Sequence, residues 1–96
     1  MMTIWKFPLA ITDGQEVKMP KGATILSVGM IGDSLFLWAM VDSEEVEKEY
    51  RQIRIHGTGH HVYKYDRLTF LGTVIQPLPM SVPPALVWHI FEERRP

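Results

Sequence analysis

The residues best able to do chemistry in this 96-residue chain gather in one stretch, Arg54 to His61. Its Gly57-Thr58-Gly59 triplet contains two glycines, which release the backbone so that successive N–H groups can point at one anion. Thr58 adds a hydroxyl, and Arg54 adds a donor for charge-assisted hydrogen bonds. The stretch therefore predicts a phosphate- or nucleotide-binding corner.

Two tyrosines follow this stretch and can stack on a nucleotide base. The predicted ligand-binding residues are Arg54, His56, Gly57, Thr58, Gly59, His60, Tyr63 and Tyr65. A second interpretation stays open, because a glycine-rich triplet is also what a tight turn at the end of a strand requires. In that case the histidines are surface residues of a structural turn.

Metal and catalytic chemistry are less well supported by the spacing of these residues. His56, His60 and His61 lack the spacing of zinc motifs and the chain has no cysteine, so no metal or cofactor is expected. His56-Gly57-Thr58 has the His-x-Thr form of the two-histidine phosphoesterases, but His89-Ile90-Phe91 does not supply the second triplet. No serine lies in a nucleophile-elbow context. We therefore predict no catalytic residues, and a histidine-dependent hydrolase is the least favoured reading.

The segments that must position this stretch alternate between apolar and polar residues, which is typical of strands. Strands are expected over residues 5–11, 15–19, 24–31, 35–41, 50–56, 68–76 and 85–92. The pair around Gly32-Asp33-Ser34 is the clearest hairpin, Pro8 predicts an edge strand, and Gly72 predicts a bulge. Prolines predict an extended connector up to residue 84. The whole chain, 1–96, is predicted to be one all-β domain, an antiparallel β-sandwich or small barrel of six to seven short strands.

The segment Leu35 to Val41 is apolar on both faces. Such a strand is normally covered on both sides, and a chain this short buries a thin core. We therefore predict a homo-oligomer, most simply a symmetric dimer. The alternative is a central strand that its own chain covers on both faces.

Composition excludes several classes of partner. Ten Lys and Arg stand against eleven Asp and Glu, which argues against broad nucleic-acid binding because that requires many phosphate contacts. No apolar run approaches the roughly 18 residues of a membrane span. The N-terminus lacks a signal-peptide pattern, and the absence of cysteine fits a reducing compartment. The expected location is the cytoplasm.

Several segments resemble a family of small, uncharacterised proteins encoded in bacteriophages and prophages. The resemblance is carried, in order along most of the chain, by residues 4–9 (IWKFPL), 19–23 (MPKGA), 26–28 (LSV), 37–42 (LWAMVD), 55–60 (IHGTGH) and 70–74 (FLGTV). It implies a viral origin and an accessory role, such as countering host defence. It implies no catalytic residues.

Three hypotheses follow for function. The first is an accessory binding protein that sequesters a phosphate-bearing small molecule, such as a nucleotide immune signal. The second is a protein–protein inhibitor or adaptor that acts on a host protein through a strand edge or the acidic loop. The third is the hydrolase already disfavoured above.

Overall fold

The computed structural model describes residues 1–77 and 85–94, which form two antiparallel β-sheets. A three-stranded sheet has the order β1-β4-β3, and a four-stranded sheet has the order β2-β5-β7-β6. The strands are β1 (Met2–Leu9), β2 (Gly14–Pro20), β3 (Thr24–Ile31), β4 (Ser34–Asp42), β5 (Lys48–Gly57), β6 (Leu68–Pro77) and β7 (Ala85–Glu93). A 3-10 helix, η1 (Tyr65–Arg67), precedes β6. The connector predicted beyond Pro77 lies outside the described residues.

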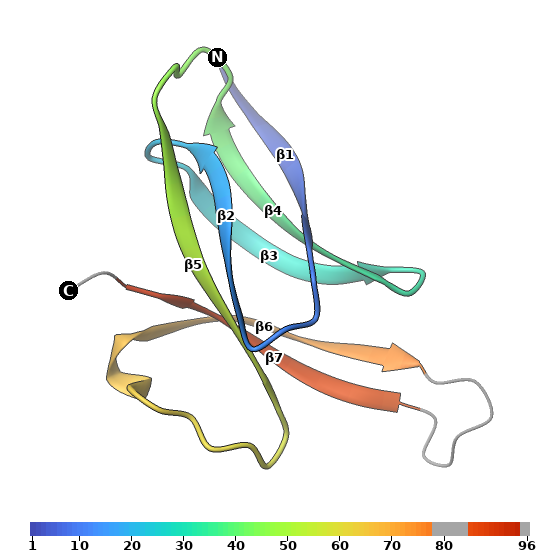
Figure 1. Cartoon of the computed structure of the whole chain (residues 1–96). Helices are drawn as coiled ribbons and strands as arrows, with labels where there is room; N and C mark the ends of the chain where they lie inside the picture. Colours follow the sequence, from blue (N-terminus) through green and yellow to red (C-terminus); the bar gives the residue numbers. More distant parts are fainter. Residues whose placement is uncertain (78–84, 95–96) are drawn as a thin grey trace.

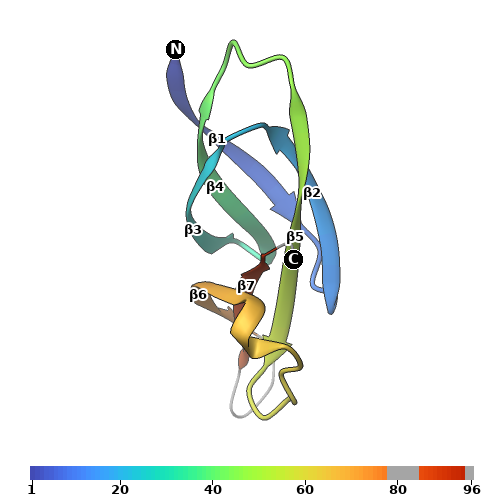
Figure 2. The same ribbon diagram turned by 90° about the vertical axis from the view of Figure 1, so that its left-hand side faces the viewer.

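The two sheets form the layers of a sandwich, which confirms the predicted all-β class and excludes a closed barrel (Figures 1 and 2). The core lies between the layers. It is built mainly from alternate residues of the strands, as period-two patterning requires, together with Ala23 just before β3. The buried apolar residues are Leu9, Val17, Met19, Ala23, Leu35, Leu37, Ala39, Val41, Ile53, Ile55, Val74 and Ile90. Because Ile53 and Ile55 point inward, Arg54 and His56 must face the outer side of the four-stranded sheet.

Strand pairing confirms the local predictions. The hairpin joins β3 to β4 with Ile31 opposite Ser34, so its turn is two residues long and Ser34 belongs to the strand. Pro8 lies in β1, which is an edge strand of its sheet, where a missing N–H costs no ladder bond. β5 is a central strand of the four-stranded sheet, because it pairs with β2 on one side and with β7 on the other.

The predicted bulge occurs where β6 passes under β3. The register between β6 and β7 shifts between Phe70 and Gly72. A Cβ atom at Gly72 would lie 2.8 Å from Cγ2 of Val28 in β3. Glycine is therefore needed for the close approach of the two sheets at this corner.

A polar cluster around Arg51, in the first half of β5, lies at the margin of the interior. The Arg51 guanidinium donates to both oxygens of Glu92, to Glu49 and to the carbonyl oxygen of Ala23. Hydrogen bonding to Glu92 raises the pKa of Arg51 above its ordinary value, so the guanidinium stays charged. The cluster ties β5 to β7 and to the turn that leads into β3.

Candidate functional site

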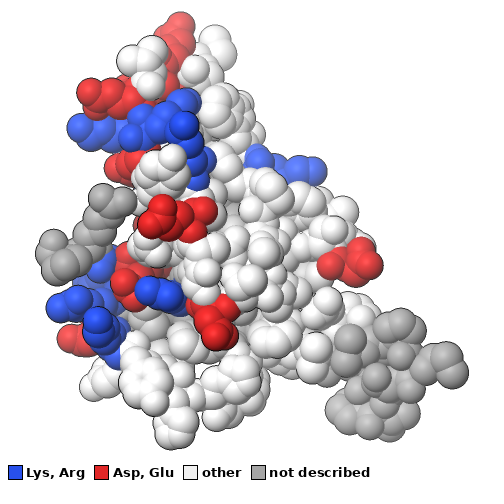
Figure 3. Space-filling view, in the orientation of Figure 1, with Lys and Arg blue, Asp and Glu red and all other residues white. Residues whose placement is uncertain are grey.

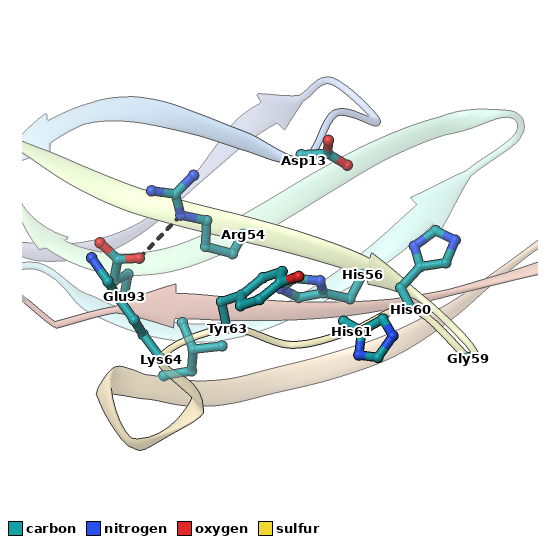
Figure 4. A pocket seen from close by; sticks show the side chains of 10 residues that line it. Asp13, Arg54, His56, Gly59, His60, His61, Tyr63, Lys64 and Glu93 are labelled. Atoms are coloured by element: carbon teal, nitrogen blue, oxygen red, sulfur yellow. Dashed lines mark hydrogen bonds and ion pairs between the residues drawn. The ribbon is translucent and has the colours of Figure 1, made fainter.

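A hollow of about 710 Å³ lies on the outer side of the four-stranded sheet, where the loop after β5 runs alongside the sheet. Figure 4 shows Arg54 and His56 reaching it from β5, and Tyr63 and Lys64 from the loop. Its lining consists of Asp13, Arg54, His56, Gly59, His60, His61, Tyr63, Lys64, Leu68 and Glu93. This volume is typical of small-molecule sites.

The hollow brings together most of the residues that the sequence singled out. Five of the eight predicted ligand-binding residues line it: Arg54, His56, Gly59, His60 and Tyr63. The lining does not include Gly57, Thr58 or Tyr65. Sequence reasoning missed Asp13 and Glu93, since only strand pairing brings the β1–β2 turn and the end of β7 beside Arg54.

Arg54 is held in place from two sides. Its Nε donates to Oε1 of Glu93 at 3.1 Å, and its guanidinium lies directly over the backbone of Gly14, where a Cβ atom would come within 2.2 Å of Nη1. Nη1 and Nη2 form no hydrogen bond with another described residue. With respect to the described residues, Arg54 therefore presents two donor groups without an acceptor, in the planar arrangement that recognises carboxylate and phosphate oxygens.

The Gly57-Thr58-Gly59 triplet forms a tight turn. The N–H of His60 donates to the Gly57 carbonyl at 3.1 Å, and Gly59 has the positive φ of 91° that favours glycine. The N–H of Gly57 donates to Nδ1 of the His60 ring, also at 3.1 Å. That N–H is thus occupied within the turn, and His60 accepts the bond with an unprotonated Nδ1.

His89 anchors this turn to the sheet. Its Nε2 lies 2.8 Å from the Thr58 hydroxyl, and its Nδ1 lies 3.0 Å from the Thr73 hydroxyl. The Thr58 hydroxyl is therefore engaged with His89 rather than with His56, which stands edge-on to Phe91 at 5.8 Å between ring centroids. Among residues 1–77 and 85–94, no group of three or more His, Asp and Glu side chains is placed to hold a metal ion.

The far wall of the hollow is the loop between the turn and η1. Tyr63 is 81% exposed, and its ring lies 6.3 Å from that of His61 with only 31° between the planes. Lys64 adopts a left-handed conformation, and Arg94 ties the loop to the end of β7 through the backbone of Arg67 and Asp66. A planar group entering the hollow would meet an exposed aromatic face.

The charges around the hollow are balanced. Arg54 and Lys64 face Asp13 and Glu93 across the same lining. On the side of the molecule shown in Figure 3, basic and acidic side chains alternate along one margin, and no continuous basic surface forms. Recognition of an anion at this hollow would therefore depend on directed donors rather than on a large positive field.

The fold is thus a small β-sandwich with a hollow on the outer side of its four-stranded sheet. The chain belongs to a protein family described as a domain of unknown function, DUF7352, and the match covers residues 1–96. No curated protein and no solved structure matches the chain. The described residues contain no helix with the length and apolar character needed to cross a membrane.

Proposed function

We propose that this protein binds a phosphate-bearing small molecule, such as a nucleotide, in the hollow between β5 and the loop that follows it. The observation that carries the proposal is the state of Arg54. Glu93 and Gly14 hold its guanidinium in position, while Nη1 and Nη2 have no acceptor among the described residues. An arginine held in this way loses less conformational entropy when a ligand oxyanion binds.

The remaining lining fits the rest of such a ligand. Lys64 supplies a second cation, and Tyr63 with His61 supplies ring faces on which a base can stack. The rings of His56 and His61 add N–H groups that can donate hydrogen bonds to a ligand. The ligand would thus be anchored by its phosphate near Arg54 and by its base near Tyr63.

The resemblance to phage and prophage proteins supports a biological setting for this binding. In that setting the protein is an accessory factor in the host cytoplasm that sequesters a nucleotide signal of host defence. Because sequestration needs binding without turnover, the proposal includes no catalytic step.

The test is a thermal melting screen of the full chain against cyclic and linear nucleotides. Each nucleotide is paired with its own nucleoside, which keeps the base and lacks the phosphate. We expect at least one nucleotide to raise Tm by roughly ten degrees or more, because a ligand at 100 times its Kd stabilises by about 2.7 kcal/mol. Equal shifts with the nucleosides, or no shift with any nucleotide, would contradict the proposal.

The alternative function, an inhibitor or adaptor that binds a host protein, has one specific observation in its favour. β1 and β2 are edge strands, and each offers a backbone ladder to an added strand. Two results together would favour this alternative. The chain would form a complex with a host protein that a proline in the middle of β2 prevents, and no nucleotide would raise Tm in the melting screen.

A further inference from the structure

The outer side of the three-stranded sheet is an uncovered apolar face. Its outward residues include Met2 and Ile4 of β1, Phe36, Trp38 and Met40 of β4, and Ile31 of β3, as the register requires. Ile4 is 54% exposed. In Figure 2 these strands form the left-hand layer, and no described element lies on its outer side. The alternative in which the chain itself covers both faces of β4 is thus met only on the inner face, where Leu37 and Val41 are buried.

The size of the exposed surface points to a missing partner. The chain has an accessible surface of 6429 Å². A monomeric protein of its mass exposes about 5,650 Å², so the whole chain exposes roughly 800 Å² more, an area comparable to what one partner buries in a standard interface.

The few charges on this sheet are of opposite sign. β1, β3 and β4 together contain two charged residues, Lys6 and Asp42, of opposite sign. They lie on either side of the row formed by Ile4 and its partner Met40. The N-terminal amine lies between Asp42 and Glu44, which leaves one net negative charge at that end of the face.

We propose that this protein forms a symmetric dimer in which the outer faces of two β1-β4-β3 sheets pack against each other. The two-fold axis lies in the plane of the interface, perpendicular to the strands, and passes through the row of Ile4 and Met40. It places Ile4 of one subunit against Ile4 of the partner subunit. The same axis sets each Lys6 beside Asp42 of the partner subunit. The hollow on the four-stranded sheet stays outside this interface, so the dimer carries two outward-facing binding sites.

The test compares two variants of the full chain by sedimentation velocity at micromolar concentrations. Ile4→Lys places a charge on the proposed interface, and Ile75→Lys makes the same change on β6, an edge strand of the other sheet, where the residue is similarly exposed at 59%. We expect the wild-type chain and Ile75→Lys to sediment at twice the chain mass of 11.1 kDa. We expect Ile4→Lys to raise the dimer Kd by at least thirtyfold, the effect of losing a central contact.

Urea melts of both variants establish that each still folds. A wild-type chain that is monomeric at tens of micromolar would overturn the proposal, as would a dimer that survives Ile4→Lys. A dimer broken by Ile75→Lys would place the interface on the wrong sheet. Charge reversal gives a second readout: Lys6→Asp and Asp42→Lys each weaken the dimer severalfold, and the double reversal restores it. Failure to restore would contradict the two-fold arrangement.

Discussion

Strand β5 carries two arginines on opposite faces of one sheet, and they are held in different ways. Arg51 points inward and uses all three of its nitrogens on Glu92, Glu49 and the backbone of Ala23. Arg54 points outward and, among the described residues, bonds only Glu93, through Nε. The Arg54 side chain is 39% exposed, whereas that of Arg51 is 20% exposed. The two residues are three positions apart, so the pleat alone sends them to different faces.

The comparison separates stabilisation from recognition. A guanidinium whose donors are all used inside the fold has nothing left for a ligand, and its removal leaves carboxylates unpaired. A guanidinium held by one donor keeps its other donors for binding, and its exposed ion pair adds little to stability. We therefore expect Arg51 to stabilise the fold and Arg54 to contact the ligand in the proposed site.

The largest expected effect is that of Arg51→Ala on stability. It leaves Glu92 and Glu49, which are largely shielded from solvent, without their shared partner. We expect a loss of about 2–3 kcal/mol in the free energy of unfolding, measured by urea denaturation with an unchanged m-value. Arg51→Lys keeps the charge and should recover part of this loss. If Arg51→Ala lowers the free energy of unfolding by less than about 0.5 kcal/mol, the cluster does not stabilise the fold.

Arg54→Ala should have the opposite profile. We expect its unfolding free energy to fall by less than about 1 kcal/mol, while affinity for a nucleotide found in the melting screen falls roughly tenfold or more. Isothermal titration of the folded variant measures this. The control is Arg54→Lys, which keeps the charge but loses the planar fork and should recover only part of the affinity. Unchanged affinity in Arg54→Ala would sink the assignment of the site.

Gly14→Ala tests position rather than charge. The added methyl group would occupy the place of Arg54 Nη1, so the guanidinium must swing away while its charge remains. We expect binding to weaken severalfold and stability to change by less than about 1 kcal/mol, again by titration and urea denaturation. Gly22→Ala is unsuitable as a control, because Gly22 has a positive φ of 82° that disfavours alanine. The control is Ala10→Ser, a similarly small change in the connection that precedes Gly14. An affinity equal to wild type would mean that the held position of Arg54 does not matter.

Thr58→Ala should give the smallest effect, and it sharpens the original prediction that Thr58 contacts the ligand. Because its hydroxyl is engaged with His89, we expect a stability loss of about 0.5–1 kcal/mol and an affinity within twofold of wild type. Thr73→Val removes the other partner of His89 and is the matched control. A tenfold loss of affinity in Thr58→Ala, with no such loss in Thr73→Val, would show that the Thr58 hydroxyl contacts the ligand.

The sequence patterns predicted the local features well, because each depends on neighbouring residues. Alternation of apolar residues gave the strands, Pro8 indicated an edge, Gly72 marked a bulge, and Gly32-Asp33 marked a hairpin, all confirmed in the structure. Five of the eight residues predicted to bind a ligand line the hollow in the outer side of the four-stranded sheet. Whether that stretch binds a ligand stays a prediction.

The sequence by itself determined the class of fold and the faces on which Arg51 and Arg54 lie, because both follow from the period of a strand. Only the tertiary structure decided what each arginine meets. Glu92 and Glu93 are adjacent in the chain, yet β7 pairs with β5 so that one reaches Arg51 inside and the other Arg54 outside. The pairing of β7 with β5 on one side and with β6 on the other likewise brings Thr58 and Thr73 to His89. Contacts between distant segments depend on register and sheet order, which local patterns do not encode.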